Sequence, residues 1–249
     1  MGTITFSDVL PDPSNLLGDG GQTGEGSAGP GFKTVTLESK TPVMRTRTNS
    51  GTVITRSRAS HTWTANISYN PLTRAAFEPV DTFLLQRQTS LKPFLISLPQ
   101  NKVPQDSTFA AYLLTTDTTI VPTADLASGV TQMTITNSGG TAYNSTTKGT
   151  CKPGDMFTIT DTGDANHTKM YKVTRVETNA KYEGSTQPTT AQQRIHFIPP
   201  LAKSVESTTT TLRLYNPFMR VIMKGDVQSY SLDSKGLYKF SLKVEEAQP

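Results

Sequence analysis

Apolar and polar residues alternate in two long stretches of the chain. Between Val53 and Tyr69, every second residue from position 59 onward is apolar, aromatic or histidine, and the residues between them are polar. Residues 238–245 repeat the pattern, and Lys33 to Leu37 also reads as extended. Period-two alternation predicts β-strands with one buried and one solvated face. The expected inward residues of the first stretch are Ala59, His61, Trp63, Ala65, Ile67 and Tyr69.

Residues 72–88 change to a helical period. Large apolar residues recur three and four positions apart, which predicts one helix with an apolar stripe. Thr73 is a candidate N-cap, and Pro79 either kinks the helix or begins its main part. The chain then enters the apolar segment 93–99, a predicted short strand. The stripe consists of Leu72, Ala76, Phe77, Val80, Phe83 and Leu84.

The middle of the chain has a different pattern. Residues 105–205 contain short apolar segments separated by polar, turn-rich loops, and this spacing predicts a small β-sandwich or barrel. The segments are GVTQMTIT, CKPGDMFTIT, KMYKVTRVE and RIHFIPPL. We therefore expect residues 105–205 to be a β subdomain inserted into a domain formed by residues 33–104 and 206–249. A hairpin loop is expected at Asp233 to Gly236.

The first 32 residues are expected to form a flexible arm. Residues 11–31 are rich in Gly, Pro and Ser, so ordering them in isolation costs more conformational entropy than their few apolar groups return. Such an arm either remains a floppy tail or becomes ordered across a neighbouring subunit.

Composition and charge favour a β protein without a nucleic-acid groove. Of the 249 residues, 18% are charged, below the typical value of about 25%, and Thr and Ser are abundant. The net charge of +4 is spread along the chain without a run of like charges. The densest basic stretch includes Arg56 and Arg58, which share a face of an extended strand; we interpret that face as solvated or as an interface.

Cysteine content and hydropathy limit the class of protein further. Cys151 is the only cysteine, which excludes intramolecular disulfides and a cysteine-based zinc site. The residues from Met1 to Leu10 lack a basic leader with an apolar run, and no stretch approaches the roughly 18 apolar residues of a membrane span. We expect a protein without a membrane span, assembled in a reducing cytoplasm.

Histidines and acidic residues give no catalytic or metal motif. His61, His167 and His196 are far apart in sequence, and none belongs to an HExxH pattern. His61, beside Trp63, is expected to be a packed, hydrogen-bonded histidine. Carboxylates at positions 155, 161 and 164 could bind calcium, but their spacing departs from that of an EF-hand loop.

A glycine motif at positions 24–29 is also without function. Gly24, Gly26 and Gly29 spell GxGxxG, but no strand precedes them, and Pro30 follows where a nucleotide-binding helix would begin. The sequence thus predicts no catalytic residue, no cofactor and no metal, and we do not expect an enzyme.

The stretch SRASHTWTANISYNPLTRAAFEPVDTFLLQRQTSLKPFLISLP resembles the opening module of tail-tip and baseplate proteins of long-tailed bacteriophages. In that module a strand with a central Trp leads through a Y-x-P-L-T corner into a helix, which ends at a Phe-rich strand capped by Pro. Residues 154–155, 167–173 and 195–201 and the closing strands are also similar to parts of such proteins. The matching residues of the opening module are Trp63, Tyr69, Pro71, Leu72, Thr73, Phe77, Phe83, Phe94 and Pro99.

This resemblance implies a mainly β structural virion protein with a tail-tube-like β-sandwich or barrel and a flanking helix. It implies a ring around the tail axis, expected to be hexameric, in the role of a distal tail protein or tube initiator. Partners would be copies of the chain and neighbouring tube, hub or baseplate proteins, with no specific nucleic acid. Most large apolar residues near element ends should be core, with one or two as interface anchors. Candidate assembly contacts are Phe32, Arg56, Arg58, Trp63, Tyr69, Leu72, Phe77 and Phe218.

Other functions remain open at this stage. Residues 105–205 could instead be a receptor- or glycan-binding module, with polar and aromatic loops near Tyr143, Asn144, Tyr171 and Tyr182. A head-to-tail connector of the neck is a further alternative. A cell-wall hydrolase would need paired catalytic carboxylates or a metal triad, which the sequence does not show.

Overall fold

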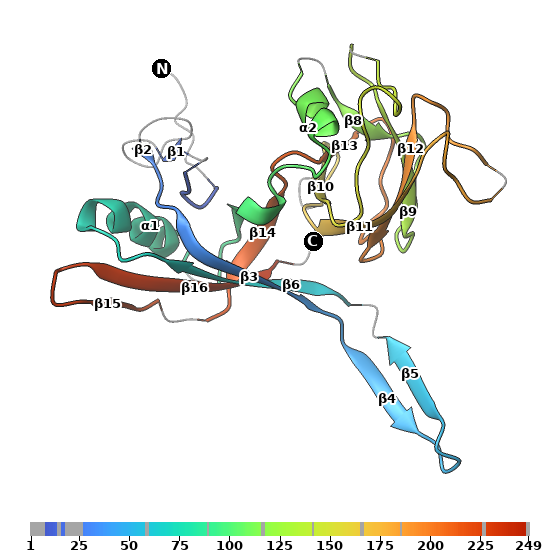
Figure 1. Cartoon of the computed structure of the whole chain (residues 1–249). Helices are drawn as coiled ribbons and strands as arrows, with labels where there is room; N and C mark the ends of the chain where they lie inside the picture. The colour runs from blue at the N-terminus through green and yellow to red at the C-terminus, as the bar shows by residue number, and fades with distance from the viewer. Residues whose placement is uncertain are drawn as a thin grey trace. The chain divides into compact units, whose positions relative to one another are not determined.

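A computed structural model describes residues 8–13, 16–17, 27–57, 60–88, 90–115, 118–140, 142–164, 167–184, 186–225 and 228–247. The chain divides into two compact units. Unit 1 comprises Met1–Ile96 and Arg220–Gln248, and unit 2 comprises Ser97–Met219. Both are built mainly of β-strands, so the predicted fold class is confirmed (Figure 1).

The main sheet of unit 1 has the strand order β3-β6-β16-β14-β7. The central strand β6 (Thr62–Tyr69) pairs antiparallel with β3 (Phe32–Lys40) on one side and β16 (Tyr238–Glu246) on the other. The alternation predicted for β6 is confirmed, since Trp63, Ala65, Ile67 and Tyr69 are all buried. Ala59 lies outside the described residues. The remaining strands are β14 (Phe218–Met223), β7 (Phe94–Ser97) and β15 (Tyr230–Leu232), which pairs with β16.

The helix α1 (Arg74–Gln86) packs Phe77 of its apolar stripe against aromatic residues of β15 and β16, and Phe83 against Phe94 of β7. Phe77 stacks on Tyr238 with 4.6 Å between ring centroids and also contacts the rings of Tyr230 and Phe240. The helix begins two residues after the predicted start because the backbone of Leu72 pairs with Tyr238 through hydrogen bonds of 2.8 and 2.9 Å. Pro79 lies inside the helix.

Part of the segment expected to be a flexible arm is docked on unit 1. The amide of Leu10 donates to the carbonyl of Leu95 at 2.8 Å, the amide of Leu95 donates to Asp8 at 2.8 Å, and Leu10 is fully buried. The edge of β7 thus forms hydrogen bonds with the backbone of Asp8 and Leu10, and the Leu10 side chain is removed from water. Together these two contributions offset the entropy cost of ordering the segment. Strand β1 (Leu16–Leu17) pairs with β2 (Ser27–Ala28). Residues 1–7, 14–15 and 18–26 lie outside the described part.

The run from Val53 to Tyr69, expected as one strand, is two strands in different sheets. β5 (Val53–Ser57) pairs with β4 (Val43–Arg47) in a separate two-stranded sheet, and β6 belongs to the main sheet. Gly51 has a φ of +83° in the β4–β5 turn, a conformation that glycine adopts without strain. Figure 1 shows β4 and β5 as a ribbon that extends beyond the ends of β3 and β6.

Unit 2 is a six-stranded antiparallel sheet of order β13-β10-β11-β12-β9-β8. Its edge strands, β13 and β8, contact each other, so the sheet curls almost into a barrel. The four predicted segments form β9 (Gln132–Asn137), β10 (Met156–Asp161), β11 (Met170–Glu177) and β12 (Gln193–Ile198). Four further elements were not expected from the sequence pattern: β8 (Ile120–Pro122), β13 (Thr210–Arg213), the helix α2 (Ser107–Leu113) and the short 3₁₀ helix at Pro99–Asn101.

Aromatic side chains fill the core of unit 2. The rings of Phe157, Tyr171 and Phe197 lie 5.3 to 5.5 Å apart between centroids, and all three are buried. These residues come from β10, β11 and β12 and point to one face of the sheet. Such contacts contribute beyond the burial of apolar area alone.

Candidate functional site

The exposed hairpin of unit 1, here called the arginine hairpin (residues 43–57), carries both apolar and basic side chains. All five residues of β4 are exposed, and among the described residues β4 pairs only with β5. Residues 43–57 contain three arginines and no acidic residue. The exposed apolar side chains are those of Val43, Met44, Val53 and Ile54.

Both faces of the arginine hairpin combine the two kinds of side chain. The register pairs Met44 with Arg56 and Thr46 with Ile54, so these four residues share one face. The opposite face carries Val43, Arg45, Arg47, Val53 and Thr55. A two-stranded hairpin is at best marginally stable alone in water, and an exposed group of apolar residues with a polar rim is typical of interaction surfaces.

A second assembly feature is the edge of the main sheet. Among the described strands, only β6 pairs with β3, which is nine residues long and mostly exposed. Its outer edge therefore presents backbone N–H and C=O groups that another strand could pair with.

The predicted contact residues fall into buried and accessible groups. Trp63, Tyr69, Leu72 and Phe77 are buried in unit 1. All four belong to the buried apolar core, so their role within this chain is core packing.

The accessible candidates are spread over three strands. Phe32 is half-buried on β3, where it contacts the edge of the Tyr69 ring, and Arg56 is exposed on β5. Phe218 is half-buried, with the Arg213 guanidinium 3.8 Å from the centre of its ring. Arg58 lies outside the described residues.

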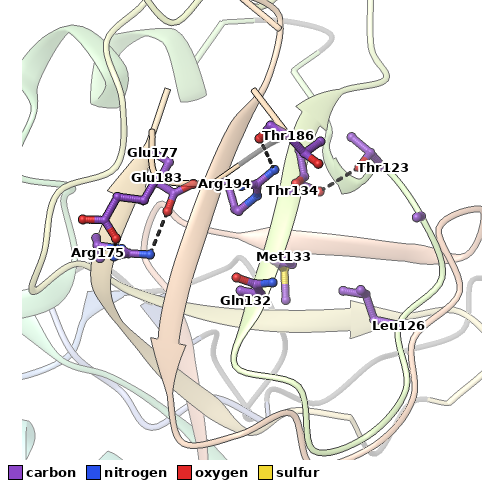
Figure 2. A pocket seen from close by; sticks show the side chains of 12 residues that line it. Thr123, Leu126, Gln132, Met133, Thr134, Arg175, Glu177, Glu183, Thr186 and Arg194 are labelled. Carbon is purple, nitrogen blue, oxygen red and sulfur yellow. Dashed lines mark hydrogen bonds and ion pairs between the residues drawn. The ribbon is translucent and has the colours of Figure 1, made fainter. Parts of the chain in front are cut away.

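Unit 2 has a polar pocket of about 440 Å³, here called the β11 pocket. Figure 2 shows that side chains from β9, β11 and β12 and from the β11–β12 loop point into it. Thr123 donates a hydrogen bond to the carbonyl of Thr134 at 3.2 Å, which joins two parts of the wall. Its polar lining includes Thr123, Gln132, Thr134, Arg175, Glu177, Glu183, Thr186 and Arg194.

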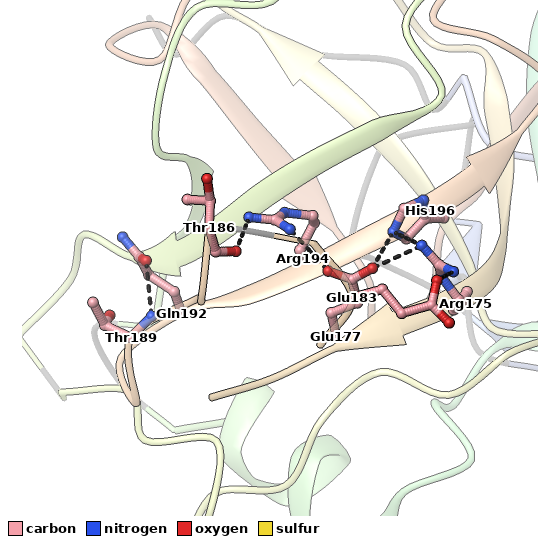
Figure 3. A network of polar contacts seen from close by, with 8 residues as sticks. All are labelled: Arg175, Glu177, Glu183, Thr186, Thr189, Gln192, Arg194 and His196. Carbon is pink, nitrogen blue, oxygen red and sulfur yellow. Dashed lines mark hydrogen bonds and ion pairs between the residues drawn. The ribbon is translucent and has the colours of Figure 1, made fainter. Parts of the chain in front are cut away.

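A buried carboxylate organises one side of the pocket (Figure 3). Glu177, whose side chain is 4% exposed, accepts from Arg175 Nη2 at 2.7 Å, Arg194 Nη1 at 2.8 Å and His196 Nε2 at 3.0 Å. Burial alone would raise the pKa of Glu177, but the hydrogen bond and charge of His196 and the charges of both arginines outweigh it and lower the pKa.

The same two arginines hold the β11–β12 loop. Arg175 Nη1 contacts Glu183 at 2.6 Å, and Arg194 Nη2 donates to the carbonyl of Thr186 at 2.8 Å. Sequence reasoning did not find this network. Its signal is the alternation of charged or histidine residues with apolar ones at positions 175–177 and 194–196.

The other two histidines have packing roles. His61 hydrogen-bonds Ser39 at 2.9 Å and contacts the Trp63 ring edge-on, as expected for a packed histidine. His167 Nε2 lies 3.1 Å from the hydroxyl of Tyr171, and burial lowers the pKa of His167.

The acidic residues considered for calcium have protein partners. Asp155 accepts from the amides of Gln105 and Lys152, and Asp161 accepts from the amide of Gly163. Within the described part of the chain, no group of three or more His, Cys, Asp or Glu residues could hold a metal ion. None of the described helices is long and apolar enough to span a bilayer.

Comparison with known proteins identifies the opening part of unit 1. Residues 21–101 match the family model described as "Distal tail protein pb9, A domain, N-terminal". These residues are similar to the N-terminal part of the A domain of a phage distal tail protein. The match confirms the resemblance to phage tail-tip proteins, and it covers β3, the arginine hairpin, β6, α1 and β7.

The distal tail match supports a structural role in a bacteriophage tail. It does not extend to the β11 pocket, which lies C-terminal to the matched residues. No curated protein matches the chain.

Proposed function

We propose that the protein forms a symmetric ring, expected to be hexameric, at the tail tip or baseplate, and that this ring joins the tail tube to the hub. In this proposal the protein is not an enzyme, needs no cofactor and assembles in the cytoplasm of the bacterial host. Its partners are copies of itself and neighbouring tube, hub or baseplate proteins.

The observation that carries the proposal is the arginine hairpin. Four large apolar side chains on it are roughly half exposed, and two isolated strands have little stability of their own. Burying these side chains against another subunit would remove apolar area from water and stabilise the hairpin. With three arginines and no acid, the hairpin fits a partner surface that carries carboxylates.

The outer edge of β3, which pairs with none of the other described strands, supports the same proposal. A strand of nine residues with such an edge is a site for pairing with another chain, and natural proteins usually block such edges. Pairing through β3 would make the sheet continuous between subunits. In a closed ring of subunits, no β3 edge would then remain unpaired.

The two units suggest a division of roles. We propose that unit 1 is the tail-tube-like assembly domain and that unit 2, which contains residues 105–205 and also β13, is a subdomain inserted into it. The chain leaves unit 1 after Ile96 and returns at Arg220, which fits an insertion.

The test compares the assembly of the full chain with that of a hairpin variant, by light scattering and electron microscopy. The double variant Val53→Thr and Ile54→Thr keeps β-branched side chains but removes apolar area from both faces of the arginine hairpin. We expect wild-type rings and a variant shifted toward monomer. The control is Leu85→Gln, which removes an exposed apolar side chain from α1.

Rings formed equally well by both variants would contradict the role of the hairpin. A wild-type protein that stays monomeric, alone and with tube and hub proteins, would contradict ring formation itself. Location of the protein at the head–tail junction of particles would favour the neck connector instead.

A further inference from the structure

The β11 pocket contains an arginine whose two sides meet very different carboxylates. Arg175 Nη2 contacts Glu177, whose side chain is 4% exposed, and Arg175 Nη1 contacts Glu183, whose side chain is 78% exposed. Glu177 also has Arg194 and His196 as partners, so it remains paired if Arg175 changes its outer contact. The buried Glu177 therefore holds Arg175 in place, whereas Glu183, its partner on the pocket side, can be replaced.

The ion pair between Glu183 and Arg175 is weak, so another carboxylate could take the place of Glu183. An ion pair with a largely exposed partner contributes little, because water and salt screen it and two long side chains lose freedom. Glu183 also lies in the β11–β12 loop, next to Gly184, whose φ is +95°. Replacement of Glu183 by an external carboxylate would keep the guanidinium paired, so the exchange carries little penalty.

The rest of the pocket offers hydroxyl and amide groups. Thr134, Thr186 and Gln132 line it beside Arg175, and none of the described lining residues is aromatic. Recognition would thus depend on charge and hydrogen bonds, without stacking on an aromatic face. A volume of about 440 Å³ lies in the range of small-molecule sites.

We propose that the β11 pocket binds a hydroxylated organic acid, the chemistry of an acidic sugar, whose carboxylate replaces Glu183 on Arg175. The ligand hydroxyls then face Thr134, Thr186 and Gln132. This site is separate from ring assembly, which we assign to unit 1. Glu183 acts as an internal occupant that lowers the apparent affinity for the ligand.

The test uses glucuronate as the probe and titrates the full-length protein by calorimetry or by NMR. Glu183→Gln removes the internal competitor, so glucuronate should bind that variant about two- to fivefold more tightly than wild type, which is the range that exposed ion pairs represent. Arg175→Lys keeps the charge but loses the forked geometry, and it should weaken binding in either background.

Two controls separate the proposal from general electrostatics. Glu206→Gln removes the same charge from an exposed position of unit 2 outside the pocket, and it should leave the affinity for glucuronate unchanged. Glucose, which has the ring and hydroxyls without the carboxylate, should bind more weakly than glucuronate to every variant.

Equal affinity of wild type and Glu183→Gln for glucuronate overturns the proposal, as does equal binding of glucose and glucuronate. An increase in affinity as large in Glu206→Gln as in Glu183→Gln overturns it as well. Light scattering should show that Glu183→Gln forms rings as the wild type does. The glucuronate-binding result is then independent of the assembly proposal.

Discussion

At the scale of single residues, Glu177 should be the most sensitive position of unit 2. Its carboxylate lies between Arg175 and Arg194, and Glu177→Gln keeps the shape but leaves Arg194 without this counter-charge and Arg175 with only the exposed Glu183. We expect the free energy of unfolding of unit 2 to fall by about 3 kcal/mol, the lower end for a broken buried pair, because Arg175 is half exposed. Hydrogen exchange of the β11 and β12 amides measures this loss of stability locally.

The pH dependence of stability provides a second readout of Glu177. Because the folded pKa lies below the unfolded value of about 4.3, the carboxylate stabilises the fold above that value, and this contribution is lost as pH falls through the folded pKa. In the Glu177→Gln variant, this contribution to the free energy of unfolding is absent, so its loss at low pH should not be seen. As a control, Glu183→Gln should change stability by less than about 0.5 kcal/mol, and equal effects of the two variants would contradict the assigned roles.

At the scale of elements, periodicity predicted the strands and helix that have one buried face. β6 and α1 carry long periodic patterns, and both formed near the expected positions. Several short elements without such a pattern were not predicted. β8 has three residues and β13 four, and α2 has seven, too few to show a period.

The charged network of the β11 pocket could not be predicted for a different reason. A register shift between Val173 and Arg175 places Arg175 opposite His196 and Glu177 opposite Arg194. A bulge changes which residues of neighbouring strands meet, and one sequence does not reveal where it lies. The spacing of the charges is visible in the chain, but their partners follow from the register.

The docking of residues 8–13 depends on Gly29. The amide of Gly29 donates to the carbonyl of Asp12 at 3.1 Å, and a Cβ at this position would lie 2.4 Å from the carbonyl carbon of Pro11. Gly29→Ala should therefore loosen this segment, at a cost of about 1 to 3 kcal/mol, the usual range for overpacking. Limited proteolysis and hydrogen exchange at Leu10 measure the loosening.

Gly31 provides a matched control for this prediction. A Cβ at Gly31 would lie 3.7 Å from the Pro13 side chain, an ordinary contact distance. Gly31→Ala should leave the protection of Leu10 unchanged. Equal protection of Leu10 in wild type and in Gly29→Ala would show that the segment is held by β7 alone.

At the scale of the whole molecule, the arginine hairpin should be separable from folding. Lys40 of β3 pairs with Thr62 of β6, so the main sheet could close directly there if residues 41–61 were replaced by Asn-Gly, the sequence preferred in a two-residue turn. This deletion removes exposed strands but also His61, which packs against Trp63. The melting temperature should fall slightly while β-sheet content per residue is kept, and light scattering should report monomers. If the shortened protein still formed rings, assembly would have to rest on the β3 edge, and substituting Val35→Pro there would be expected to abolish the rings instead.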